Sequence, residues 1–506
     1  MRSAVGLVAA VAFGGATAPP ADTPRVKIES GTVVGTLAGP ARLFAAVPYA
    51  APPVGALRWM PPRRALSWSG ERAAQAPGPA CPQPIRPGGA PNLGGYSGPT
   101  SEDCLTLDVW APRGARRAPV MVWIFGGGNV AGASGFFSYD GRNFARDGVV
   151  LVAMNYRLGA LGFFAHPALT AEAPRGQPLV NYGLMDQIAA LKWVRRNIAA
   201  FGGDPDNVTL FGESAGGADA LDLIAIPAAR GLFNRAIVQS GGGWGPAVSL
   251  TRREADGATL ATRVGLPGAS ATAAQLRALQ AETLIADQTG LTGPALDGRL
   301  MTRTAALAFA SGAQDPVPLI IGSNSNEASL MAAFGSTAAV IAARAPAPLR
   351  AAYADDGPAD GEIGRQMFND ALMGAPARWF AREASTHAPS WLYYFSYVPE
   401  RQRATRPGTN HASEIPFVFA SLDAVPGRSA KLTPGERAEA SLVHSCWVSF
   451  ARKGRPHCQG GQPWPAYSPG TDQLLEFGEP PAVRSHFRKR QLDAQEAAAK
   501  ARPGWP

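Results

Sequence analysis

The hydrophobic positions of this chain follow two repeating patterns. Two runs, 119–125 and 149–154, are continuously apolar rather than alternating, which is typical of strands buried on both faces of a sheet. Between 184 and 198 the apolar residues recur at steps of three and four, which predicts a helix that ends at Gly202 and Gly203. Further strands are predicted at 208–211, 236–238 and 317–321. This alternation predicts an α/β fold with helices on both sides of a central, mostly parallel sheet.

Two long stretches, 244–315 and 327–388, interrupt the alternation with helical composition and weak periodicity. Insertions placed after the carboxyl ends of strands build the ligand site in such folds. The sequence contains no internal repeat and no linker long enough to separate independent domains. Residues 19–506 are therefore predicted to form a single domain, with the two insertions forming a substrate gorge.

The first residues have the order of a secretory signal: a positive charge at Arg2, an apolar run over 4–12, and small residues up to Ala18. The run is too short to span a membrane, and cleavage is expected after Ala16 or Ala18. No later stretch reaches about 18 uninterrupted apolar residues, so no membrane-spanning segment is expected. Residues 1–18 thus predict a signal peptide and a secreted or periplasmic protein.

Composition narrows the class of protein further. Of the 506 residues, 46% are hydrophobic and 17% are charged, which excludes a disordered, collagen-like or coiled-coil chain. The net charge of +9 could indicate an anionic partner. However, the lysines and arginines are scattered and are not interleaved with aromatic residues, so we expect a solvated basic surface and no nucleic-acid binding.

The four cysteines form two pairs that are close in sequence. Cys81 and Cys104 enclose a Pro- and Gly-rich segment without periodicity, and a bridge there would contribute roughly 3 kcal/mol by loop closure. We expect that disulfide. Cys446 lies in a predicted helix over 437–452, so Cys446 and Cys458 could be bridged or be buried free thiols. Neither pair has the spacing of a zinc site.

One short motif suggests a nucleophile. Gly212-Glu213-Ser214-Ala215-Gly216 is the only Gly-x-Ser-x-Gly in the chain, and it lies between a predicted strand and a predicted helix. A strand that turns abruptly into a helix strains the serine backbone and needs glycines where neighbouring backbone approaches. The motif predicts that the Ser214 hydroxyl projects from the end of the sheet.

A serine hydroxyl becomes a good nucleophile only when a base takes its proton. In the chain order of α/β-hydrolases, nucleophile, acid and then base, His166 is excluded because it precedes the serine. His444 lies within a predicted helix, whereas His411 follows a strand-like run, 391–398, after a polar loop. His411 is therefore the candidate base, and a solvent-exposed loop histidine is the alternative.

Glu327 is the candidate acid. It lies just past the predicted strand that ends at Ile321, where a carboxylate can reach an imidazole. A glutamate that only stabilises a helix N-terminus would have the same surroundings in sequence.

The backbone can supply donors for an oxyanion. The run Gly126-Gly127-Gly128 directly follows a predicted buried strand, and the Ala215 amide would add another donor. The same run also fits a dinucleotide fingerprint, which requires a helix immediately after it, but 129–135 has no helical period. No Walker loop and no His-Glu-x-x-His motif is present, so nucleotide and zinc-hydrolase chemistry have no support.

These motifs together resemble the type-B carboxylesterase/lipase family, the cholinesterase-like branch of the α/β-hydrolases. The resemblance covers about residues 27 to 480. Its blocks, in chain order, are 101–110, 123–128, 155–159, 183–217, 294–298, the segment around Glu327, and 411–415.

The resemblance implies that Ser214 is the nucleophile, Glu327 the acid and His411 the base. It also implies that Gly127, Gly128 and Ala215 are the oxyanion donors and that the family's first disulfide is Cys81–Cys104. Glu213 matches an acidic position that can tune the histidine electrostatically, and a purely structural role is the alternative.

The sequence departs from the family around the glycine run, which is flanked here by Phe125 and Asn129; this is expected to change the pocket wall near the oxyanion. The first disulfide loop, 82–103, contains no tryptophan, so choline esters are not the expected substrate. We expect a secreted serine carboxylesterase for esters of short to medium acyl chain, with no metal or organic cofactor. The alternatives are an amidase or carbamate hydrolase, a lipase, and a non-catalytic binding or adhesion protein.

Overall fold

A central sheet organises the molecule. The computed structural model describes residues 23–86, 88, 90–92, 94–245, 247–286, 292–357, 359–425, 432–461, 463–502 and 505, so the predicted signal peptide, 1–18, lies outside the described residues. The sheet contains, within these residues, β3 (Thr36–Ala38), β4 (Ala41–Pro48), β6 (Thr106–Pro112), β7 (Ala118–Ile124), β8 (Val150–Met154), β9 (Gly203–Glu213), β10 (Arg235–Gln239), β11 (Leu319–Asn324), β12 (Ser390–Phe395), β13 (Gln473–Phe477) and β14 (Ala482–Ser485). A smaller sheet is formed by β1 (Arg25–Ile28), β2 (Gly31–Val34) and β5 (Glu71–Ala73).

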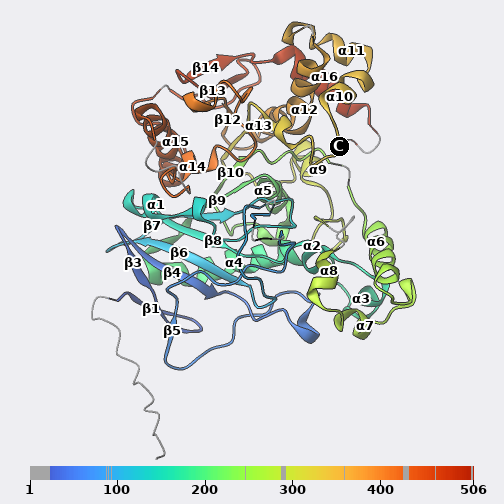
Figure 1. The fold of residues 1–506 in the computed structure, drawn as a ribbon. Coiled ribbons are helices and arrows are strands. Elements are labelled where there is room, and N and C mark those ends of the chain that lie inside the picture. The colour runs from blue at the N-terminus through green and yellow to red at the C-terminus, as the bar shows by residue number, and fades with distance from the viewer. Residues whose placement is uncertain are drawn as a thin grey trace, which may run out of the picture.

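The strands of the large sheet lie in the order β14-β13-β12-β11-β10-β9-β7-β8-β6-β4-β3 (Figure 1). Pairing is parallel from β8 through β7 and β9 to β13, and antiparallel at both edges. This confirms the predicted α/β fold with a mostly parallel sheet. Because β7 and β9 are neighbours, the loops that follow them meet at the same edge, which is where such folds bind ligands.

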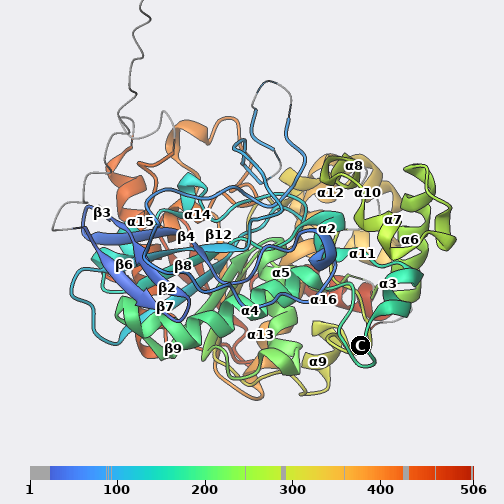
Figure 2. The same cartoon turned by 90° about the horizontal axis from the view of Figure 1, so that it is seen from below.

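Helices cover the sheet. In chain order they are α1 (Arg142–Arg146), α2 (Gly159–Phe163), α3 (Pro167–Glu172), α4 (Tyr182–Asn197), α5 (Ala215–Ala225), α6 (Leu250–Arg263), α7 (Ala273–Arg277), α8 (Ala281–Ala286), α9 (Ala305–Ala310), α10 (Ala338–Arg344), α11 (Ala347–Ala351), α12 (Asp360–Asn369), α13 (Ala375–Ser385), α14 (Ile415–Val418), α15 (Pro434–Lys453) and α16 (Lys489–Lys500). Figure 2 shows α4, α5 and α13 on one side of the sheet and α14 and α15 on the other.

The central strands of the large sheet are buried as the sequence predicts. β8 is buried at every position, and β7 from Val120 onward, because helices pack on both faces. On the side of α14 and α15, Trp123 of β7 contacts Phe211 of β9, and both rings contact Phe419. The predicted helix over 184–198 is α4, and the turn after it closes at Gly202, whose φ is +90°.

Both cysteine pairs are bridged. Cys81–Cys104 closes the loop that precedes β6, and Cys446–Cys458 ties α15 to the segment that follows it. No helix in the described ranges is both long and apolar enough to cross a membrane.

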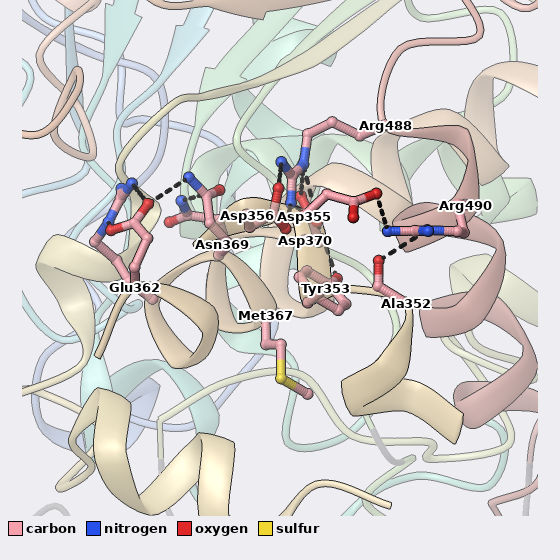
Figure 3. Close-up of polar contacts among 12 residues, drawn as sticks. Ala352, Tyr353, Asp355, Asp356, Glu362, Met367, Asn369, Asp370, Arg488 and Arg490 are labelled. Atoms are coloured by element: carbon pink, nitrogen blue, oxygen red, sulfur yellow. Dashed lines mark hydrogen bonds and ion pairs between the residues drawn. The ribbon is translucent and has the colours of Figure 1, made fainter. Parts of the chain in front are cut away.

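The two insertions form α6–α9 and α10–α13. The second is held against α16 by a polar network, which Figure 3 shows in close-up. Arg488 pairs with both Asp356 and Asp370, at 2.9 Å each, and the Tyr353 hydroxyl donates to Asp370 at 2.9 Å. Desolvation opposes ion pairs that are this far from solvent, and the additional hydrogen bonds of the network offset part of that cost.

Candidate active site

Ser214 occupies a sharp turn between β9 and α5. Its backbone has φ 56° and ψ −124°, a strained conformation for a residue other than glycine. The Ser214 amide donates to the Gln239 carbonyl at 2.8 Å, which fixes the turn. A Cβ at Gly216 would lie 2.1 Å from the Ile124 carbonyl oxygen, and one at Gly212 would lie 2.3 Å from the Gly216 oxygen. The two glycines of the motif are therefore required by close backbone contacts.

The candidate acid and base are in direct contact. Glu327 follows β11, His411 lies on the loop after β12, and His411 Nδ1 is 2.6 Å from Glu327 Oε2. Glu327 is fully buried, and its Oε1 accepts hydrogen bonds from Ser240 Oγ at 2.6 Å and the Asn324 amide at 2.7 Å. These donors hold the carboxylate in the orientation that presents Oε2 to the imidazole.

The other ring nitrogen of His411 faces a second carboxylate. His411 Nε2 lies 3.0 Å from Oε1 of Glu213, which is buried beside the serine. The Ser214 hydroxyl makes no hydrogen bond with any residue that the structure describes. The structure therefore brings Glu213, Glu327 and His411 together, without a hydrogen bond between His411 and Ser214.

Burial and neighbouring carboxylates shift the pKa of His411 in opposite directions. Burial alone would lower the pKa of His411, but the carboxylates of Glu213 and Glu327 outweigh it and raise that pKa above its usual value. Burial raises the pKa of Glu213, and the nearby carboxylates of Glu327 and Glu414 raise it further against the opposing effect of His411.

The glycine run lies beside the serine. β7 and β9 pair with Ile124 opposite Gly212, so the residues after each strand meet, and a Cβ at Gly126 would lie 2.8 Å from Ser214 Cβ. Gly127 and Gly128 have φ of +103° and +67°. Within the described part of the chain, the amides of Gly127, Gly128 and Ala215 donate to no protein acceptor. Unused amide donors grouped around a nucleophile suit a developing negative charge.

Asn129, which follows the glycine run, has a structural role. It is buried, its Nδ2 donates to Asp219 at 3.1 Å, and its Oδ1 accepts from the Tyr156 hydroxyl at 3.1 Å. The side chain therefore holds the turn against α5.

Several supporting residues were not anticipated from the sequence. Glu414, fully buried, accepts from Gln239 Nε2 at 3.0 Å and from Asn324 Nδ2. Its position three residues after His411 was the only signal.

Asn369, at the end of α12, brackets the turn that carries the acid. Its Oδ1 accepts from the Ala328 amide at 2.6 Å and its Nδ2 donates to the Ser325 carbonyl at 3.0 Å. No pattern in the sequence marks it.

Two other histidines have structural partners. His166 Nδ1 accepts from the Ala168 amide at the start of α3, and its Nε2 lies 3.0 Å from the Gly268 carbonyl. His444 Nε2 lies 3.1 Å from Asp147 Oδ2. Both histidines are buried and bonded to groups other than Ser214.

Comparison with known proteins gives one consistent result. The model of the carboxylesterase family matches residues 22–344 and 349–495. The chain is 36% identical to the fumonisin B1 esterase of Sphingopyxis macrogoltabida, over 92% of this chain and 89% of the relative. It is also 36% identical to the para-nitrobenzyl esterase of Bacillus subtilis, over 89% and 94%. A solved PNB esterase structure superposes with a TM-score of 0.81 at 34% identity, covering 92% of this chain and 99% of that one.

Proposed function

Because the chain belongs to the carboxylesterase family and is a carboxylic ester hydrolase, we propose that it cleaves esters in two steps through an acyl-enzyme on Ser214. The observation that carries this proposal is the contact of His411 with the buried Glu327 at the same edge of the sheet as the strained Ser214 turn. Such a constellation supplies a nucleophile, a base and an orienting acid.

In the first step His411 takes the Ser214 proton while the oxygen attacks the ester carbonyl. Glu327 accepts the hydrogen bond from Nδ1–H and stabilises the imidazolium that forms. The amides of Gly127, Gly128 and Ala215 donate to the oxyanion, and His411 returns the proton to the leaving alcohol. Water then repeats the sequence on the acyl-enzyme, and no metal or organic cofactor enters the reaction.

The contact between His411 Nε2 and Glu213 has a consequence for this cycle. Nε2 must exchange that contact for the Ser214 hydroxyl when substrate binds, because one nitrogen cannot serve both. Hydrogen bonds between a nucleophile and its base often tighten only in the substrate complex. We propose that Glu213 stabilises the imidazolium during both steps.

We propose acyl chains of short to medium length, since the sequence has no clear amphipathic lid of the kind that lipases use. Hydrolysis of p-nitrophenyl esters from acetate to palmitate, with Ser214→Ala in parallel, tests this. We expect turnover only with intact Ser214 and a maximum at a short or medium chain. Equal turnover by both proteins would contradict the role of Ser214, and a steep rise at lipid interfaces would favour a lipase.

An amidase or carbamate hydrolase is the second candidate on the same residues. A phenmedipham hydrolase of Pseudarthrobacter oxydans is 33% identical over 89% of this chain, so the family fold supports hydrolysis of other substrates as well. Matched ester and amide substrates separate the two functions: a kcat/KM for the amide equal to or above that for the ester would favour the amidase.

We propose further that residues 1–18 are a signal peptide and that 19–506 form one domain of a secreted or periplasmic protein. The two disulfides are consistent with an oxidising compartment. The mass of the protein recovered from the periplasm or the medium tests the proposal, with cleavage expected after Ala16 or Ala18. An intact N-terminus on exported protein would contradict it.

A further inference from the structure

The loop closed by the Cys81–Cys104 disulfide reaches the backbone that follows β7. We call residues 126–132 the oxyanion turn, since they contain the two glycine amides proposed above as oxyanion donors. We propose that Gln83, two residues after Cys81, is a positioning residue that holds this turn in its catalytic shape. The inference rests on the proposed function of Ser214 and the oxyanion turn.

Gln83 is fully buried, and every hydrogen-bonding position of its amide is used. Oε1 accepts from the Gly132 amide at 2.8 Å, and Nε2 donates to the Gly132 carbonyl at 2.8 Å. Nε2 also donates to the Cys81 carbonyl at 3.0 Å, and Oε1 accepts from Asn92 Nδ2 at 2.7 Å. One side chain thus ties both polar groups of Gly132 to two points of the disulfide loop.

Gly132 in turn supports the start of the oxyanion turn. Its φ is +132°, and a Cβ there would lie 2.4 Å from the Phe125 ring and 3.1 Å from the Gly126 carbonyl oxygen. The Gly127 carbonyl accepts from the amides of Val130 and Ala131, at 3.1 and 3.2 Å. The turn is therefore folded back on itself, so a shift of Gly132 is transmitted to the amides of Gly127 and Gly128.

The disulfide loop makes a second contact with the oxyanion turn, through Gly94. A Cβ at Gly94 would lie 2.6 Å from the Gly132 amide nitrogen and 2.7 Å from the Ala131 carbonyl carbon. Asn92 holds Gly94 in this position, because its Oδ1 accepts hydrogen bonds from the amides of Gly94 and Tyr96 at 3.0 and 3.1 Å. The disulfide loop thus holds the turn through a hydrogen-bonded side chain and through close backbone packing.

Preorganised donors stabilise the oxyanion only while they point at it, and displacement by about 1 Å can cost on the order of 100-fold in rate. Gln83→Met keeps the length of the side chain and removes all its hydrogen bonds, which frees the Gly132 peptide to shift. We expect kcat to fall by about 10- to 100-fold with KM within about threefold, because the ground-state ester does not need the oxyanion donors.

The test compares Gln83→Met with wild type, with Ser214→Ala and with Gln495→Met. Gln495 is a matched control, since it is a buried glutamine of α16 whose Nε2 donates to the Tyr353 hydroxyl and the Met367 carbonyl. Active serines are counted by stoichiometric release of p-nitrophenol from diethyl p-nitrophenyl phosphate, so kcat refers to folded sites only. The inhibition constant of an alkyl trifluoromethyl ketone, which forms a tetrahedral adduct, is measured alongside.

For Gln83→Met we expect the loss in kcat per titrated serine to be matched by an equal rise in the trifluoromethyl ketone inhibition constant, while Gln495→Met changes neither. Wild-type kcat and inhibition in Gln83→Met, with Ser214→Ala inactive, would overturn this inference alone. Retained turnover in Ser214→Ala would overturn the proposed function and this inference with it. If Gln83→Met does not fold, Gly94→Ala carries the same test with the same two outcomes, because its added Cβ meets the Gly132 amide.

Discussion

Replacing Glu213 by Gln should move the pH dependence of the enzyme to lower pH. His411 can accept the serine proton only as neutral imidazole, so activity rises as pH passes the pKa of His411. The carboxylates of Glu213 and Glu327 raise that pKa above its usual value, against the lowering effect of burial. Removing one of the two acids lowers the pKa of His411, and the acidic limb of kcat/KM follows it downward.

The size of the shift can be bounded from the geometry. Two unit charges at the 3.0 Å between His411 Nε2 and Glu213 Oε1 interact by about 5.5 kcal/mol at an effective dielectric constant of 20. This corresponds to about four pKa units at 1.36 kcal/mol per unit. It is an upper bound, because burial raises the pKa of Glu213 and so reduces its charge at neutral pH. We expect a shift of at least about one unit.

The assay is kcat/KM for p-nitrophenyl butyrate between about pH 5 and 10, corrected for the non-enzymatic rate. Glu439→Gln is the matched control, since Glu439 is a buried carboxyl of α15 whose pKa burial raises to about 8. The limb should move in Glu213→Gln and stay in place in Glu439→Gln. A limb that stays within about 0.3 units in Glu213→Gln would refute the electrostatic role of Glu213.

Three further substitutions test other parts of the account. Gly127→Ala should lower kcat by about 100-fold or more with little change in KM, because its Cβ would lie 2.1 Å from the Ala131 carbonyl oxygen; an unchanged steady-state kcat would contradict this. Asn369→Leu should lower kcat about tenfold by loosening the turn that carries the acid, and wild-type kinetics would show that the turn holds without it. Asp186→Asn breaks the buried two-point pairing with Arg157 and should cost about 3 to 5 kcal/mol in denaturant unfolding, whereas a loss below about 1 kcal/mol would disprove that role.

The sequence predicted best those strands and helices whose burial follows from the spacing of apolar residues within the element itself. The runs at 119–125 and 149–154 are apolar at consecutive positions because helices cover both faces of β7 and β8, and the spacing over 184–198 reflects one buried side of α4. The strands predicted at 208–211 and 317–321 correspond to β9 and β11, whose carboxyl ends precede Ser214 and Glu327.

Contacts set by tertiary packing left no such pattern. Gln83 lies in a Pro- and Gly-rich loop without periodicity, and its role follows only from its contact with Gly132. Asn369 contacts the turn that carries Glu327 only through the tertiary packing of the insertion 327–388. No pattern in the surrounding sequence marks it. The bridging of Cys446 with Cys458 was open for a related reason, since a helical sequence accommodates a buried thiol and a disulfide equally well.

A single labelling measurement shows whether Ser214 is the nucleophile. The protein is inactivated with diethyl p-nitrophenyl phosphate, and the modified residue is located by peptide mass spectrometry while esterase activity is followed. If Ser214 is the nucleophile, one diethylphosphoryl group per chain is found on Ser214, in proportion to the activity lost. Inactivation with the label on another residue, or full activity with Ser214 labelled, would contradict it.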